Sequence, residues 1–228
     1  MKRRALLSLA LASAFAGAAQ AQVPPSPGEV AAYQGLHAAA QRGDVAAIAR
    51  LLKSGAAIEA TDGAGRTPLH VATFARQREA VRALLQAGAN HAALEHGRYD
   101  AVTIAAVADD EDTLRLLLAG GASAKLVTSR YDGTALIAAA HLGHEGVVRQ
   151  LIAAGAPLDH VNNLHWTAAI ESVVLGDGGP RHQATLQALI DAGANLQLAD
   201  RSGHTPLALA RSRGYAAMVA MLEKAGAR

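Results

Sequence analysis

The chain has 228 residues, of which 51% are hydrophobic and 18% are charged, and it contains no cysteine. So high an apolar fraction excludes an intrinsically disordered chain. The lack of cysteine excludes disulfides, thiolate metal sites, iron–sulfur clusters and cysteine nucleophiles. Aromatic residues are only 3% of the chain, and alanine, the strongest helix former, dominates the apolar set. The composition predicts a helical protein of one or two domains with thin, closely packed elements.

The N-terminus has the three parts of a signal peptide. Lys2, Arg3 and Arg4 precede an apolar run over 5–18, and Ala-Gln-Ala at 19–21 fits the small-x-small cleavage pattern. We therefore expect a signal peptide at 1–21, cleavage after Ala21 and a periplasmic or secreted protein. The run is shorter than the ~20 residues of a comfortable bilayer span, although an uncleaved anchor remains the alternative.

Cleavage changes the charge of the chain. Loss of three basic residues leaves 18 basic and 19 acidic residues, so the basic whole-chain pI belongs largely to the leader. A nearly neutral mature chain offers no electrostatic footprint for nucleic acid. The prolines at 24, 25 and 27 predict an extended linker over 22–29, because proline fixes φ and removes a backbone donor.

The rest of the chain, 30–228, repeats itself. A Gly-Ala pair recurs with spacings of 33 to 38 residues, and its glycines are Gly55, Gly88, Gly121, Gly155, Gly193 and Gly226. Such a period is the sequence sign of stacked repeats. Six units fill the chain and leave no room for a separate catalytic domain.

Each unit contains the signals of two short helices. Apolar residues at i, i+3 and i+4 precede each of the first five glycines, as in Val81, Leu84 and Leu85, and indicate one buried helical stripe. A capping residue stands earlier in five units, and these residues are Thr67, Asp100, Thr134, Thr167 and Thr205. The pattern predicts a helix, a turn, a second helix and an irregular return.

The repeated motifs resemble those of ankyrin repeats. Gly65-Arg66-Thr67-Pro68-Leu69-His70-Val71-Ala72 and Gly203-His204-Thr205-Pro206-Leu207-Ala208 are similar to repeat openings, and Leu84-Leu85-Gln86-Ala87-Gly88-Ala89-Asn90 to a repeat close. The resemblance covers nearly the whole mature chain and implies an all-α solenoid of six helix-turn-helix units with hairpin-like returns. Tyr131-Asp132-Gly133-Thr134-Ala135-Leu136 and Asp177-Gly178-Gly179 further resemble an exported bacterial branch of the family.

The ends of the array carry the signs of caps. Glu223 stands at the position of the buried stripe that Leu52 fills in the first unit, and a carboxylate is tolerable there only if nothing stacks on that face. The first unit has Gln34 where other units have the capping threonine. We therefore expect a complete array of six units.

The resemblance implies a non-enzymatic module that binds a partner protein with its hairpins and first helices, which line a concave face. Four aromatic residues fall on the contact positions of that face. The expected partner-binding residues are Arg66, Phe74, Tyr99, Arg130, Tyr131, His141, Leu142, Trp166, Leu175 and His204. Tyrosine, tryptophan and arginine often dominate interface energy, although stacking between neighbouring hairpins is the alternative. We expect a monomer without cofactors, which assists or shields an enzyme or neutralises a toxin.

Ten histidines raise a second hypothesis, a hydrolase or metal-binding protein. His141 and His144 have the spacing of a metal pair, and His182 with the Asp177 loop aligns one repeat later. No third ligand follows at a telling spacing, and neither a nucleophile elbow nor a phosphate loop is present. The resemblance implies instead that His37 and His70 orient neighbouring loops, and that His144 occupies a common turn position.

Two loops allow alternative interpretations. The acidic run at 109–112 precedes a predicted helix, and we expect a solvated acidic turn there, since a calcium site needs a longer ligand loop. The long fifth spacing places a five-residue insertion at 177–181, in the turn between two helices. That insertion is either tolerated loop variation or a partner loop, because its glycines allow close backbone approach.

Overall fold

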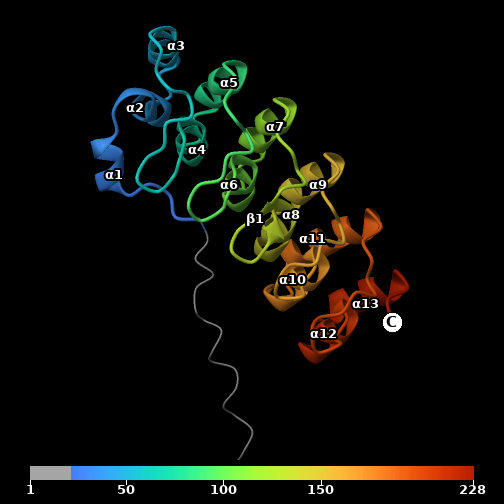
Figure 1. The fold of residues 1–228 in the computed structure, drawn as a ribbon. Coiled ribbons are helices and arrows are strands. Elements are labelled where there is room, and N and C mark those ends of the chain that lie inside the picture. Colours follow the sequence, from blue (N-terminus) through green and yellow to red (C-terminus); the bar gives the residue numbers. More distant parts are fainter. Residues whose placement is uncertain (1–21) are drawn as a thin grey trace, which may run out of the picture.

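A computed structural model describes residues 22–228 as a curved stack of six helix pairs (Figure 1). The expected signal peptide at 1–21 lies outside the described residues. The first helices of units 1 to 6 are α2 (Gly35–Arg42), α4 (Pro68–Phe74), α6 (Ala101–Val107), α8 (Ala135–Leu142), α10 (Ala168–Val174) and α12 (Pro206–Ser212). The second helices are α3 (Val45–Lys53), α5 (Arg78–Gln86), α7 (Glu111–Ala119), α9 (Glu145–Ala153), α11 (Pro180–Asp191) and α13 (Ala216–Lys224).

The predicted caps begin the first helices of units 2 to 6. In each, the side-chain oxygen of the capping residue accepts a hydrogen bond from the backbone N–H three residues later. All six predicted glycines follow the second helices in the left-handed region, with φ between 78° and 92°, which a residue without Cβ adopts at little cost. Local capping and helix-ending chemistry therefore sets the bounds of the units.

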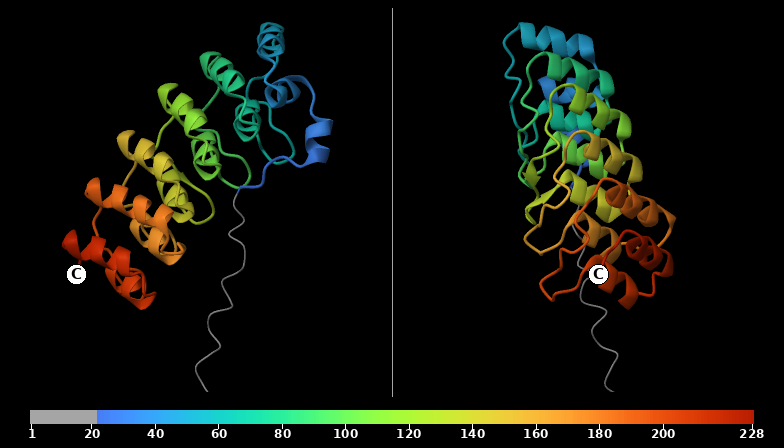
Figure 2. Two further views of the ribbon diagram at one scale, coloured as in Figure 1. Left: turned by 180° about the vertical axis from the view of Figure 1, so that it is seen from behind. Right: turned by 90° about the vertical axis from the view of Figure 1, so that its right-hand side faces the viewer.

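The core lies between the two layers of helices. Each first helix packs on the first helix of the next unit, and each second helix on the next second helix. The predicted stripe is fully buried in its middle, where Val81 and Leu84 of α5 are both 0% exposed. The residues at i+4, such as Leu85, are only partly buried against this core. Figure 2 shows the resulting arc, with the second helices on its convex side and the first helices and returns on its concave side.

The returns between units are mostly irregular hairpins. Only the one before α8 contains strands within residues 22–228, where β1 (Val127–Thr128) pairs antiparallel with β2 (Gly133–Thr134). That return is one residue longer than those before α4 and α6, since the spacing from Gly121 to Gly155 is 34. The described chain is therefore helical apart from this short ladder, as the repeat pattern predicts.

The expected extended linker is partly wrong. Residues 22–26 have no regular structure, but helix α1 covers Pro27–Ala32. Its start is a capping box, in which Ser26 accepts from the N–H of Glu29 and the Glu29 carboxylate accepts from the N–H of Ser26. Pro27 follows at the first helical position, where its fixed φ favours a helix. The proline-rich composition concealed this signal.

The insertion in unit 5 is divided between the turn and the helix. Helix α11 has 12 residues, whereas α5, α7 and α9 have nine, and the turn before it covers 175–179. The Tyr215 hydroxyl donates to the carbonyl oxygen of Gly176 (3.0 Å), and a Cβ at Gly178 would lie 2.5 Å from the Tyr215 ring. The close approach that these glycines permit is therefore to the last unit of the same chain.

Among the helices of residues 22–228, none combines the length and apolarity that crossing a bilayer requires.

Candidate functional site

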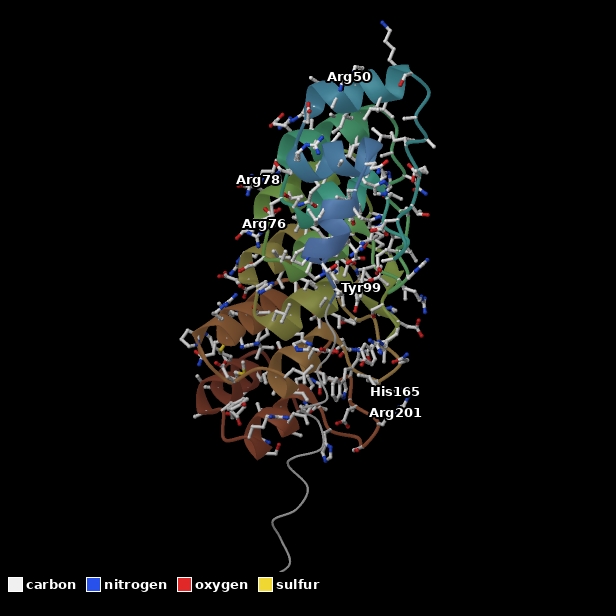
Figure 3. The ribbon with its side chains drawn as sticks, turned by 90° about the vertical axis from the view of Figure 1, so that its left-hand side faces the viewer. Arg50, Arg76, Arg78, Tyr99, His165 and Arg201 are labelled. Atoms are coloured by element: carbon white, nitrogen blue, oxygen red, sulfur yellow. The ribbon has the colours of Figure 1, made fainter. Side chains whose placement is uncertain are left out.

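The hairpins form a continuous edge because backbone hydrogen bonds join one to the next. His96 N–H donates to Ala64 (2.9 Å), Ser129 N–H to Arg98 (2.8 Å) and Asn163 N–H to Tyr131 (2.9 Å). Figure 3 shows Tyr99, His165 and Arg201 along this hairpin edge, and Arg76 and Arg78 on the opposite edge. The side chains of successive hairpins are thus held in a fixed order.

Each hairpin also has the same internal turn. A side-chain oxygen accepts the backbone N–H two residues later in all five hairpins, from Asp62, Glu95, Ser129, Asn162 and Asp200. Such turns replace backbone partners that a short loop lacks. The tips of the hairpins are therefore rigid without forming a sheet.

The four central aromatic residues lie on the hairpins and first helices, and all are half-buried. Phe74 ends α4, whereas Tyr99, Tyr131 and Trp166 lie in successive hairpins just before the capped helices. Burial raises the pKa of the Tyr99 hydroxyl above its ordinary value. The guanidinium carbon of Arg130 lies 5.8 Å from the centre of the Tyr131 ring, within the range of a cation–π contact.

Exposed aliphatic side chains occur in the same region. Seven large hydrophobic residues are at least 36% exposed in residues 22–228, and five of them lie in the hairpins or just after α10. These five are Leu94, Val127, Val161, Leu164 and Leu175. Exposed apolar residues that gather on one face mark an interaction surface.

Arg66 does not belong to this surface, so its predicted partner contact is wrong. The residue is 2% exposed. Its Nε donates to Asp62 (2.7 Å), and its other nitrogens contact the Glu29 carboxylate and the Val23 carbonyl. Arg66 instead holds the segment before α2 against the first hairpin.

The Arg66 network shifts the pKa of its neighbours. Burial alone would raise the pKa of the Asp62 carboxyl, but hydrogen bonds from Tyr33 and Arg66 outweigh it and lower the value to about 2. Burial, the Asp62 hydrogen bond and nearby carboxylates raise the pKa of Tyr33, against the opposing field of Arg66. Tyr33, Asp62 and Arg66 thus form one charged network at the start of the array.

Four further predicted contact residues lie at the surface, although in different ways. His141 and Leu142, at the end of α8, are half-exposed, and Leu175, just after α10, is 41% exposed. His204 is exposed in the last hairpin, with its Nδ1 3.5 Å from Asp200. The hairpins and first-helix ends therefore present every predicted contact residue except Arg66.

The histidines of the second hypothesis serve mainly in packing. His144 Nδ1 hydrogen-bonds the Ala106 carbonyl (2.9 Å), and His182 Nε2 the His141 carbonyl (3.0 Å). Both side chains thereby satisfy carbonyls at the end of the preceding first helix. Among residues 22–228, no group of three or more such ligands could hold a metal ion.

The predicted loop-orienting histidines have the expected contacts. His37 Nε2 hydrogen-bonds the Arg66 carbonyl (2.9 Å), and His70 Nε2 the Ala93 carbonyl (3.0 Å), each in the next hairpin. Burial lowers the pKa of the His70 imidazole. These residues couple each first helix to the following return.

The acidic turn at 109–112 is less solvated than expected. Asp110 is 3% exposed, caps α7 through Thr113, and forms an ion pair with Arg78 (3.2 Å). Burial opposes its ionisation, but hydrogen bonds from Thr113 and Arg78 lower its pKa. One carboxylate of the run therefore joins units 2 and 3, while its neighbours remain exposed.

Two features of this region escaped the sequence prediction. Val23 helps to line a pocket of about 380 Å³ with residues 95–99 and Arg130, so the N-terminal segment lies against the hairpins; the Ser26-x-x-Glu29 capping box was the available signal. Glu171 and Asn162 are also buried and hydrogen-bonded to each other (3.0 Å). Their signal was a carboxylate at an apolar position of the repeat.

Comparisons with known proteins agree with this architecture. The family model for ankyrin repeats (three copies) matches residues 9–95 and 102–198. The ankyrin repeat protein YahD of Escherichia coli (strain K12) is 35% identical over 190 residues, covering 83% of this chain and 94% of that protein.

Solved structures give the same result. An ankyrin repeat domain from Acinetobacter baumannii AYE is 43% identical with a TM-score of 0.80, covering 85% of this chain and 98% of that one. The ankyrin repeat domain of Bcl-3, a member of the IkappaB family, is 28% identical with a TM-score of 0.77, covering 86% and 88%. Sequence motifs, helix pairs and relatives together show that this chain belongs to the ankyrin repeat family.

Proposed function

We propose that the protein is an exported, non-enzymatic binding module that holds a partner protein on its concave face. Ankyrin repeat domains are protein–protein interaction modules, and relatives of this chain are generally non-enzymatic. The observation that carries the proposal is the gathering of exposed aliphatic side chains on the hairpins and beside the end of α10. Half-buried aromatic rings accompany them, and both are typical of interface centres.

The mechanism is preorganisation. Capped helices, repeated side-chain turns and backbone links between hairpins fix the contact residues before a partner arrives. Binding then costs little ordering entropy, which leaves more of the contact energy as affinity. A rigid solenoid needs no induced fit to present this face.

The N-terminal segment narrows the open part of the face. Its Val23 carbonyl contacts Arg66, and its Val23 side chain lies beside residues 95–99 and Arg130. The partner surface therefore extends from Tyr131 through His141 and Trp166 to Leu175. Those residues come from units 4 and 5 and from the hairpins before α8 and α10.

Export follows from the expected leader at 1–21 and its cleavage after Ala21. The proposed place is the periplasm or the cell exterior, where the protein acts as a monomer. Protection or assistance of an enzyme and neutralisation of a toxin are the roles that suit such a module. Mass spectrometry of the protein from a bacterial envelope fraction tests export, with a mature chain that starts at Gln22 as the expected result.

Partner capture tests the binding face. The purified protein is immobilised, partners are captured from a periplasmic extract, and the strongest partner is titrated against wild type and variants. Trp166→Ala and Tyr131→Ala are expected to weaken binding, whereas Arg82→Ala, an exposed change on α5, serves as the matched control. Equal affinity of all four proteins would refute the face, and absence of any captured protein would refute the module.

A further inference from the structure

Units 4 and 5 depart from the repeat pattern at three positions that meet in space. The fourth residue after the cap is apolar in five units, as Ala38, Val71, Ile104, Ala138 and Leu209, but is Glu171 in unit 5. Glu171 is 4% exposed. Burial of a carboxylate costs free energy unless it is paired, and a break in an otherwise consistent pattern is typical of a functional site.

The second departure supplies a donor for this carboxylate. Equivalent turn positions in the other hairpins hold Asp62, Glu95, Ser129 and Asp200, whose side-chain oxygens accept backbone hydrogen bonds. Asn162 keeps that role through its Oδ1, and its Nδ2 also donates to Glu171 Oε1 (3.0 Å). An aspartate at 162 has no such donor and would place two carboxylates in contact.

The third departure is His141, at the seventh residue after the cap of α8. Its Nδ1 lies 3.3 Å from Glu171 Oε2, and the side chain is 29% exposed. Phe74, Val107 and Val174 occupy the same position in neighbouring units. Within residues 22–228, no group hydrogen-bonds His141 Nε2, so this nitrogen remains available at the concave face.

The arrangement favours recognition over chemistry by this chain alone. Ser172, beside Glu171, donates its hydroxyl to the Ala169 carbonyl (2.9 Å), so it is no nucleophile for His141. His182 reaches the backbone carbonyl of His141, and its Nδ1 lies 3.1 Å from Asp177. The remaining free group is the outward nitrogen of an imidazole that a buried carboxylate holds in place.

The surrounding charges indicate what this nitrogen meets. Glu171 is the carboxylate that packs on His141 from α10, α6 contributes no titratable residue, and α11 contributes His182 at the backbone. In the hairpin before α8, Asp132 pairs with Arg98 (3.1 Å), whereas exposed Arg130 forms no ion pair within the described chain. Cationic groups without acidic partners and apolar neighbours therefore share this part of the face.

We propose that His141, Asn162 and Glu171 form an anchor for an acidic side chain in an apolar segment of the partner. The protonated ring forms an ion pair with Glu171 through Nδ1, and its Nε2–H donates to the partner's carboxylate. Histidine changes charge between pH 5 and 8, so binding strengthens as pH falls through that range. This inference rests on the proposed concave-face function and specifies its partner chemistry.

The test uses a phage-displayed library of random 12-residue peptides, selected on the immobilised protein at pH 6 and at pH 8. We expect selection at pH 6 to enrich peptides with Asp or Glu among apolar residues. A synthetic peptide from that pool is then titrated by Trp166 fluorescence beside its Asp→Asn or Glu→Gln counterpart. Affinity is expected to fall on the order of tenfold from pH 6 to pH 8.

Three variants assign this pH dependence. His141→Gln and Glu171→Gln are expected to remove most of it, whereas His204→Gln, at an exposed hairpin histidine, is expected to retain it. Loss of partner capture in Trp166→Ala with no effect of His141→Gln would overturn the anchor and leave the proposed function standing. Absence of binders at pH 6, no acidic enrichment or a pH-independent affinity would each also overturn it.

Discussion

Tyr33 donates a hydrogen bond of 2.7 Å from its hydroxyl to Asp62, which joins the residue after α1 to the first hairpin of the array. Asp62 in turn accepts from Arg66, and Arg66 reaches Glu29 in α1. The segment after the expected cleavage site is therefore part of the folded array, and its attachment depends on ionised carboxylates.

The first prediction concerns pH and Tyr33. The folded-state pKa of Asp62, about 2, lies below its unfolded value of about 4, so its stabilisation is complete above pH 4 and is lost as pH falls towards 2. Tyr33→Phe removes one cause of that shift. We expect the variant to lose about 1 kcal/mol of unfolding free energy at pH 7, and less at pH 2.5. Urea unfolding at both pH values measures this, and a constant difference contradicts it.

A second prediction concerns Arg66. Arg66→Ala leaves the Asp62 carboxylate without its buried partner, so we expect a loss of about 3 kcal/mol of unfolding free energy. Arg98→Ala breaks an exposed pair and is expected to cost less than about 1 kcal/mol. Urea denaturation compares the two. Similar costs would show that the Arg66 network is no more than a surface contact.

The departures of unit 5 give a third prediction. The Asn162→Asp, Glu171→Val double variant restores the residue types of unit 2, where Asp62 and Val71 stand. Replacement of a buried polar pair by residues that fit the repeat is often neutral or stabilising. We expect an unfolding free energy equal to or up to about 2 kcal/mol above that of wild type, together with loss of the pH-dependent peptide binding.

The single variant is its control. Asn162→Asp alone places a second carboxylate beside Glu171 and is expected to cost about 2 kcal/mol at pH 7. Urea denaturation of both proteins measures the difference. If the double variant is as destabilised as the single one, Glu171 serves the fold and its role as an anchor loses this support.

Sequence alone predicted the repeats because their signals are local. Capping residues, helix-ending glycines and the apolar stripe each act within one turn of helix, so their positions set the helix bounds directly. Arg66 was misplaced because its burial depends on α1, which begins more than 30 residues earlier and whose capping box lies among prolines. The same holds for Asp110, whose partner Arg78 belongs to the preceding unit.

The anchor was missed for a related reason. His141, Asn162 and Glu171 come from three segments that only the stacking of units 4 and 5 brings together. Comparison of equivalent positions among the six units marks Glu171 as unusual, because its position is otherwise apolar. The ion pair itself follows only from coordinates.

The last prediction concerns the aromatic residues of the binding face. Trp166 and Tyr131 are half-buried and lie in adjacent hairpins that are linked through the N–H of Asn163. At an interface centre, truncation of either ring is expected to cost about 2 kcal/mol of binding, or roughly thirtyfold in affinity. The unfolding free energy is expected to change less than for a core truncation such as Leu84→Ala, because Leu84 is fully buried. Calorimetric titration of the captured partner against Trp166→Ala, Tyr131→Ala and Arg82→Ala measures the first effect, and urea unfolding measures the second. A large loss of stability with unchanged affinity would mean that the rings only support neighbouring hairpins, and the contact face would then have to lie elsewhere on the array.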